Sequence, residues 1–184
     1  MQVVKSQVQS EIDVLLTNKI HKGNQQKSLR RWGFSFVIIL LTVYLLTAVV
    51  FEIEIIHGSS MNNTFTDGQL AVSYRLSKSY DYSDVVILKN ISDNDYIKRI
   101  IGLPGDTVDL NAETGAVVLN GAVLDESYAL GKTMSTDENM EYPVHLGENE
   151  YFVLGDNREH SSDSRFFGAI KREQIKGKVI LPQN

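Results

Sequence analysis

The chain has 184 residues, 42% hydrophobic and 22% charged, which fits one globular domain with an apolar anchor. It contains no cysteine, so disulfide bonds and thiolate metal sites are excluded. The formal net charge of −5 is uneven, because residues 1–31 carry +4 and residues 32–184 carry −9. This acidic main part argues against nucleic acid as a partner, since nucleic-acid binding depends on basic surface.

The N-terminal part divides into a basic segment and an apolar one. Residues 1–31 are polar and basic and predict a cytoplasmic tail, disordered or with a marginal amphipathic helix. Residues 32–51 are uncharged and, as a helix, would be about 30 Å long, which matches a bilayer core. This run is too long for a cleaved signal peptide. Basic residues before it and glutamates after it predict a single-pass cell-membrane protein with a cytoplasmic N-terminus and residues 52–184 outside.

After the anchor, short alternating runs bounded by turn residues predict antiparallel strands. The expected strands are residues 53–59, 69–76, 85–88, 96–101, 117–119, 122–124 and 151–154. Asn120-Gly121 predicts a hairpin turn, because these residues tolerate positive φ. Residues 125–143 predict an irregular surface excursion. The expected fold class is therefore mainly β, with a single N-terminal transmembrane helix before an antiparallel, β-rich extracytoplasmic catalytic domain.

Ser60 is a candidate nucleophile, placed among small residues directly after the first expected strand. A serine hydroxyl needs a neighbouring general base to accept its proton. His21 would lie across the membrane, and His57 would point to the opposite face of the strand from Ser60. His145 and His160 have no local signature of a catalytic base.

Lys98 is the better candidate for the base. It lies in an apolar run, and burial among isoleucines would disfavour its charged form and lower its pKa. A shift from about 10.4 to about 7 is within the range of buried lysines. The alternative reading is an exposed lysine on an edge strand.

Three separated motifs resemble those of the type I signal peptidases, membrane-anchored Ser/Lys endopeptidases that remove signal peptides from exported proteins. Ser60-Met61 with Thr64 resembles the nucleophile box, residues 98–106 resemble the lysine box, and residues 155–168 resemble the third box. The resemblance spans residues 34–180 and has the same order of motifs behind a membrane span.

Two positions depart from the family pattern. Asn63 stands where the family usually has proline, whose loss should loosen the turn after the nucleophile. Gly58 stands where some members carry a hydroxyl that serves as the second donor to the oxyanion.

The resemblance implies a serine endopeptidase with Ser60 as nucleophile and Lys98 as base, acting on signal peptides of exported preproteins at the lipid bilayer. It implies that Ser161 orients the lysine amine and that Asp163 pairs with nearby arginines, for which Arg165 and Arg99 are the candidates. The apolar residues that it implies for the substrate pockets are Ile56, Met61, Phe65, Tyr96 and Ile97.

Two other functions are each marked by a different sequence feature. A non-cleaving relative that assists assembly of surface structures such as pili would be marked by loss of the serine or the lysine. A self-cleaving Ser/Lys regulator would carry a DNA-binding segment and no membrane span. Calcium binding in the third box is rejected, because an EF-hand needs glycine and glutamate where Ser161 and Phe167 stand. No metal or cofactor is expected.

Overall fold

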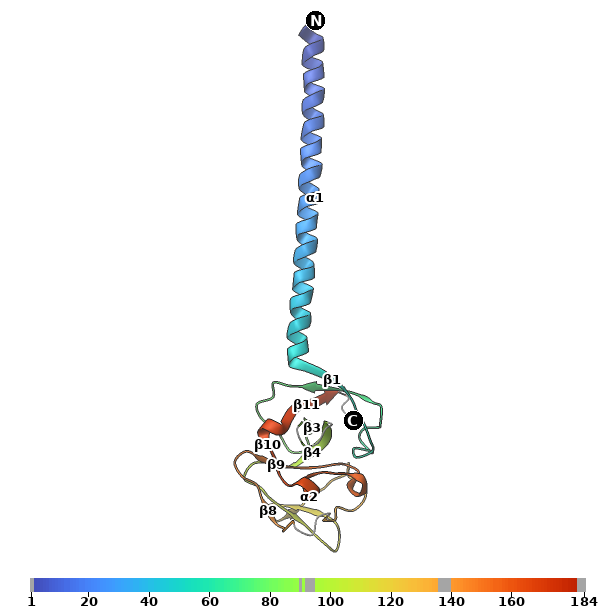
Figure 1. The fold of residues 1–184 in the computed structure, drawn as a ribbon, viewed down its shortest axis with the longest axis vertical. Coiled ribbons are helices and arrows are strands. Elements are labelled where there is room, and N and C mark those ends of the chain that lie inside the picture. Colours follow the sequence, from blue (N-terminus) through green and yellow to red (C-terminus); the bar gives the residue numbers. More distant parts are fainter. Residues whose placement is uncertain (1, 90, 92–94, 136–139, 182–184) are drawn as a thin grey trace. The chain divides into compact units, whose positions relative to one another are not determined.

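The computed structural model describes residues 2–89, 91, 95–135 and 140–181. They belong to two units, Met1–Ala48 and Val49–Asn184, each of which is considered by itself (Figure 1).

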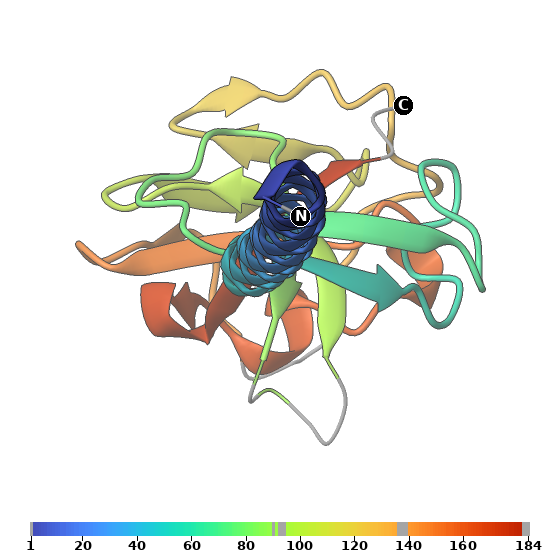
Figure 2. The same cartoon turned by 90° about the horizontal axis from the view of Figure 1, so that it is seen from above.

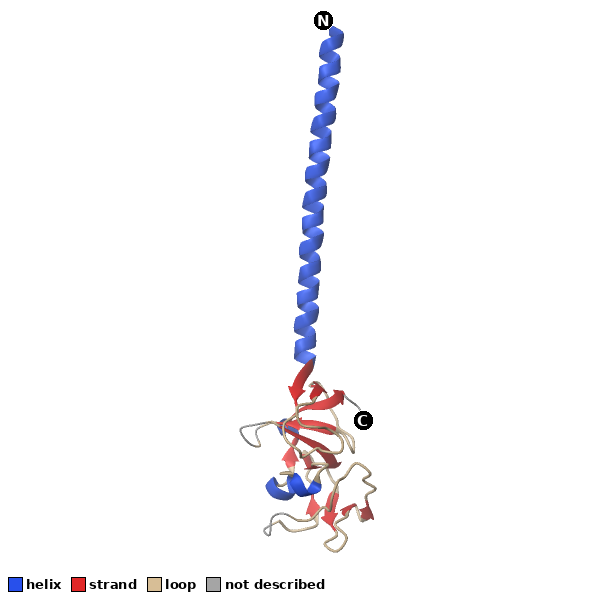
Figure 3. Cartoon of the chain, turned by 90° about the vertical axis from the view of Figure 1, so that its right-hand side faces the viewer, coloured by secondary structure: helices blue, strands red, loops and turns tan. Residues whose placement is uncertain are grey.

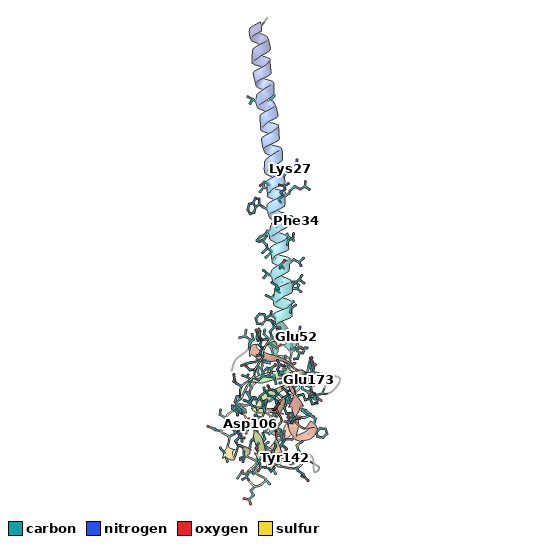
Figure 4. The ribbon with its side chains drawn as sticks, turned by 90° about the vertical axis from the view of Figure 1, so that its left-hand side faces the viewer. Lys27, Phe34, Glu52, Asp106, Tyr142 and Glu173 are labelled. Atoms are coloured by element: carbon teal, nitrogen blue, oxygen red, sulfur yellow. The ribbon has the colours of Figure 1, made fainter. Side chains whose placement is uncertain are left out.

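The first unit is one long helix, α1 (Gln2–Val50). This helix is continuous through residues 2–31, where a disordered tail or a marginal helix was expected (Figure 3). Its segment Lys27–Val50 is long and apolar enough to cross a membrane, the one such segment in the described part of the chain. Apolar side chains such as Phe34 project outward from it (Figure 4). Thr42 donates its hydroxyl proton to the helix carbonyl of Ile38, so this polar group is satisfied without water.

The second unit is built on a seven-stranded antiparallel sheet in the order β1-β2-β11-β3-β4-β9-β10. Its strands are β1 (Phe51–Ile55), β2 (Leu70–Tyr74), β3 (Val85–Leu88), β4 (Tyr96–Gly102), β9 (Glu150–Leu154), β10 (Ile170–Lys171) and β11 (Ile175–Leu181). The same unit contains a second, four-stranded sheet in the order β7-β6-β5-β8. Its strands are β5 (Thr107–Leu110), β6 (Val117–Leu119), β7 (Ala122–Val123) and β8 (Val144–His145). Short helical turns η1 (Arg158–His160), α2 (Ser164–Phe167) and η2 (Arg172–Gln174) complete the unit.

The expected mainly antiparallel β fold is confirmed. The hairpin β6–β7 turns at Asn120-Gly121, whose φ angles are 52° and 82°. Strands β5, β8, β10 and β11 were not foreseen. β11 lies between β2 and β3, inside the sheet, and contains Lys176 and Lys178. Both lysines are ion-paired, which is why a central strand tolerates them.

Strands β4 and β9 are neighbours that are buried on both faces, and each contributes side chains to two hydrophobic clusters. Figure 2 shows the strands of the unit from above. Successive side chains of a strand point to opposite faces, so Ile100 and Val153 enter one cluster while Ile101 and Phe152 enter another. The second of these clusters also contains Val108 and other residues of the smaller sheet. The two sheets therefore share a core, and β4 is fixed from both sides.

Replacing Phe152 by alanine should lower the free energy of unfolding by about 3–5 kcal/mol, since its fully buried ring joins the two sheets. The change can be measured by urea denaturation of the detergent-solubilised chain, followed by near-UV circular dichroism. The tyrosine signal suits this purpose because seven of the eight tyrosines lie after residue 50. Val123→Ala, at a side chain 67% exposed, is the control and should change stability by no more than about 0.5 kcal/mol. Equal effects of the two substitutions would contradict the shared core.

Candidate active site

The structure brings Ser60 and Lys98 together. Ser60 lies in a tight turn beyond β1, and Lys98 lies in β4. The Lys98 Nζ donates to the Ser60 Oγ at 2.9 Å, although 38 residues separate them in the sequence. Lys98 is only 2% exposed, and β4 is an interior strand, so the reading of an exposed edge-strand lysine is wrong.

The surroundings of Lys98 favour its neutral form. Burial lowers the pKa of Lys98 from 10.5 to about 8. The carboxylates of Asp163 and Asp156 oppose this shift, and the guanidinium of Arg165 adds to it. A lysine with a pKa near 8 is partly neutral around neutral pH, so its amine can accept a proton.

The histidines lie elsewhere. His145 shares a hydrogen bond of 2.9 Å with Thr107 between β8 and β5, and His57 and His160 are exposed. Among the hydrogen bonds of the described residues, the Ser60 Oγ is bonded to Lys98 and to no histidine. This geometry offers the serine a lysine as its base.

The third box packs directly on the turn that carries Ser60, called the nucleophile turn here after the candidate role of this serine. The Asn157 backbone N–H donates to the Ser60 carbonyl at 3.0 Å, and the Asn157 side-chain amide donates to the Ser59 carbonyl at 3.1 Å. A Cβ at Gly155 would lie 2.2 Å from the Ser161 Oγ and 2.6 Å from the Ser60 carbonyl oxygen. Only glycine fits this position without displacing the nucleophile turn.

The hydrogen bond that the resemblance implied between Ser161 and the lysine amine is absent from the described contacts. The Ser161 Oγ is buried and has no hydrogen-bond partner there. The Lys98 Nζ donates instead to the Ser60 Oγ and to the Ile97 carbonyl, the latter at 2.8 Å. The amine is thus oriented by Ser60 and by its own strand.

The buried ion pairs correct one predicted partner. Asp163 binds Arg165 through two contacts of 2.8 Å, which confirms that pair. Arg99 binds Asp156 instead, at 2.8 and 2.6 Å, so its proposed pairing with Asp163 is wrong. The reason is the register of β4 and β9, which places Arg99 opposite Leu154, two residues before Asp156.

Asn63 replaces the usual proline with a different restraint. Its φ is 91°, which proline cannot adopt because its ring fixes φ near −65°. Its side-chain amide donates to the Tyr128 carbonyl at 3.0 Å. The loop expected to be loosened by the missing proline is therefore tied to the segment 125–135.

That segment was expected to be a surface excursion, but part of it is held by the third box. The buried Arg158 binds both oxygens of Glu126, at 2.9 and 2.7 Å. The Leu130 N–H donates to the Asp156 carbonyl, and the Arg158 N–H donates to the Leu130 carbonyl. No local pattern marked Glu126 or Arg158 as partners, since they are 32 residues apart.

A cleft of about 890 Å³ opens beside the two residues. Four of the five expected substrate-contacting residues, Ile56, Met61, Tyr96 and Ile97, line it together with Ser60 and Lys98. Phe65 does not line it and is packed in the core with Ile56 and Met61. The lining residues that sequence reasoning missed include Glu54, Ile87 and Asp95. The described residues contain no group of three or more side chains suited to hold a metal ion.

Several known proteins are similar in sequence to this chain over most of its length. The family model described as "Signal peptidase, peptidase S26" matches residues 29–183. A signal peptidase I of Bacillus licheniformis is 33% identical over 178 residues, which cover 88% of this chain and 93% of that protein. Signal peptidase I S of Bacillus subtilis is 33% identical over 170 residues, which cover 86% and 91%. A crystal structure of a signal peptidase I from Enterococcus faecalis has a TM-score of 0.46 and 30% identity, covering 56% of this chain and 98% of that chain. By the extent of the family match and of these identities, the chain belongs to the signal peptidase family, peptidase S26.

Proposed function

We propose that this chain is a membrane-anchored serine endopeptidase that cleaves signal peptides from exported preproteins, with Ser60 as nucleophile and Lys98 as general base. The observation that carries the proposal is the 2.9 Å contact between the buried Lys98 amine and the Ser60 hydroxyl. Membership of the signal peptidase family supplies the substrate class. The cleft beside the two residues has room for an extended peptide.

The reaction follows the usual order of acyl transfer. The neutral Lys98 amine takes the proton of Ser60 as the Oγ attacks the scissile carbonyl carbon. The resulting ammonium gives this proton to the departing amine nitrogen, which leaves an acyl ester on Ser60. Lys98 then takes a proton from a water molecule as the water oxygen attacks the ester carbonyl carbon. When the bond between this carbon and the Oγ breaks, the Lys98 ammonium gives the proton to the Oγ, so that Ser60 and the neutral amine are restored, and the carboxylic acid product loses its proton to solvent.

The oxyanion of each tetrahedral intermediate needs fixed donors. We assign the Ser60 backbone N–H as one of them. The Gly58 N–H is already bonded to the Asp67 carboxylate at 2.8 Å, so it is not the second. That bond holds Gly58 at a φ of 86°, in the turn that leads to the nucleophile.

The substrate would lie as an extended strand with small side chains, such as alanine, at the first and third positions before the cut. Ile56, Met61, Tyr96 and Ile97 offer the apolar surface for them. Residues 27–50 would anchor the enzyme with its N-terminus in the cytoplasm, given the basic residues before this segment. Anchoring raises the effective concentration of an enzyme whose substrates are themselves membrane-embedded.

Ser60→Ala and Lys98→Met should each lower cleavage of a preprotein by about 10³-fold or more, because one removes the nucleophile and the other the base. The assay uses the detergent-solubilised full chain and follows the mature product on gels. Ser79→Ala and Lys78→Met, at exposed positions, are the matched controls and should cleave at the wild-type rate. A folded wild-type chain that cleaves no preprotein would instead support the non-cleaving assembly role.

The pH dependence follows from the base. Lys98 acts only when neutral, so kcat/KM should rise about tenfold per pH unit below pH 8 and reach half of its maximum near pH 8. An ordinary lysine would place this midpoint near 10.5. Initial rates between pH 6 and 10 at constant ionic strength test this, and a flat profile between pH 7 and 10 would exclude Lys98 as the base.

Gly155→Ala should lower kcat about 100-fold, because the added methyl group displaces Ser161 and the Ser60 carbonyl and shifts the nucleophile. Gly147→Ala is the matched control, since its Cβ would meet only the flexible end of the Glu150 side chain, at 3.3 Å. Single-turnover cleavage rates compare the two. Wild-type rates in Gly155→Ala would show that the close packing is not required.

A further inference from the structure

A lysine outside the proposed catalytic pair connects distant strands of the sheet. Lys176 lies in β11, and its Nζ bonds to Glu54 at 2.5 Å and to Asp95 at 2.6 Å. A third carboxylate, that of Glu52, lies 3.1 Å from the same nitrogen. Glu52 and Glu54 belong to β1, whereas Asp95 directly precedes β4.

Glu54 and Asp95 both line the cleft, and they come from two different segments of the chain. Residues 53–58 form one wall and residues 95–98 form the other. In the sheet, β2, β11 and β3 separate β1 from β4, so no ladder of backbone hydrogen bonds joins the walls directly. β1 is an edge strand that pairs only with β2, and its position relative to β4 depends on contacts across the sheet face.

Two such contacts lie at different points along the cleft. The Lys98–Ser60 bond joins the walls at the reactive end. Lys176 joins them near Asp95, which is three residues from Lys98 and therefore about 10 Å away along an extended strand. Ile87 and Ile97 line the cleft too and are paired across β3 and β4. These two side chains give this part of the cleft an apolar surface.

We infer that Lys176 is a positioning residue for substrate binding, which fixes the separation of the two cleft walls through its bonds to Glu54 and Asp95. The inference rests on the proposed peptidase function only for the identity of the peptide. A peptide that adds as a strand between two walls needs both at a set spacing. Walls already held at this spacing lose less conformational freedom when the peptide binds, and so bind it more tightly.

Lys176 stays positively charged at the pH at which Lys98, the proposed base, becomes neutral. Burial lowers the pKa of Lys176, but its hydrogen bonds to Asp95, Glu54 and Glu52 outweigh this and raise the pKa above its ordinary value. The ammonium therefore persists at the pH at which Lys98 loses its proton. The pKa values of the two lysines shift in opposite directions, because Lys176 is surrounded by carboxylates and Lys98 is buried in a largely apolar strand.

Lys178 supplies a matched control. It lies in the same strand and makes an ion pair of 2.7 Å with Asp84, and neither residue lines the cleft. Lys176→Met and Lys178→Met each remove one ammonium from β11 with a similar loss of charge. Partly exposed ion pairs contribute little to global stability, so both variants should fold.

The first test measures cleavage of a signal-peptide substrate. Lys176→Met should raise KM about tenfold and change kcat less than about twofold, whereas Lys178→Met should change neither. Lys176→Arg, which can bond to both walls, should restore most of the affinity. Equal KM values for the two methionine variants, or a loss in kcat with KM unchanged, would overturn the inference.

The second test does not depend on turnover. Binding of a fluorescent signal-peptide fragment to Ser60→Ala is compared by anisotropy with binding to Ser60→Ala combined with Lys176→Met or with Lys178→Met. The Lys176→Met combination should bind about tenfold more weakly. If the wild-type chain cleaves no signal peptide but the Lys176→Met combination still binds the fragment about tenfold more weakly, only the proposed function is overturned. Equal binding of the three proteins, or no binding by Ser60→Ala, would overturn the role of Lys176.

Discussion

A lysine amine held in an apolar strand without a carboxylate bonded to it is the constraint that shapes this domain. Asp156 and Asp163 lie near enough to favour the charged form of Lys98, which would make it useless as a base. Each is bound by its own arginine, Arg99 or Arg165, which offsets its charge. The buried ion pairs therefore hold the third box in place, and the Arg165 guanidinium also helps to lower the pKa of the amine.

The third box connects the other parts of the site. Its backbone contacts the nucleophile turn through Gly155 and Asn157, its Asp156 holds β4 through Arg99, and its Arg158 holds the segment around Glu126. Every one of these contacts is between residues distant in the sequence. The proposed nucleophile is thus positioned by segments from the whole domain. This explains why the third box, although short, contains several buried charged side chains.

Much of this could be predicted from sequence, because the apolar segment long enough to cross a membrane, the hairpin at Asn120-Gly121 and the three motifs are each encoded locally. Pairings were harder, since the choice of Asp156 over Asp163 by Arg99 follows from the register of β4 and β9. β11 was missed because its alternating lysines resemble an exposed segment, and their carboxylate partners lie at least 81 residues away. The hydrogen bond from the Asn63 side chain to the Tyr128 carbonyl could not be predicted, because it depends on the positive φ angle of Asn63, which no sequence pattern indicated.

The place of β11 also bears on when the enzyme can form. The strand that carries Ser60 beyond it, β1, pairs with β2, and the strand that carries Lys98, β4, pairs with β3. Only β11, the last strand of the described chain, joins these two pairs into one sheet. During synthesis, the β1–β2 and β3–β4 hairpins are not joined into one sheet until β11 has emerged, and its pairing with β2 brings together residues far apart in the sequence. The sheet that supports both Ser60 and Lys98 is therefore complete only after β11 has paired with β2 and β3.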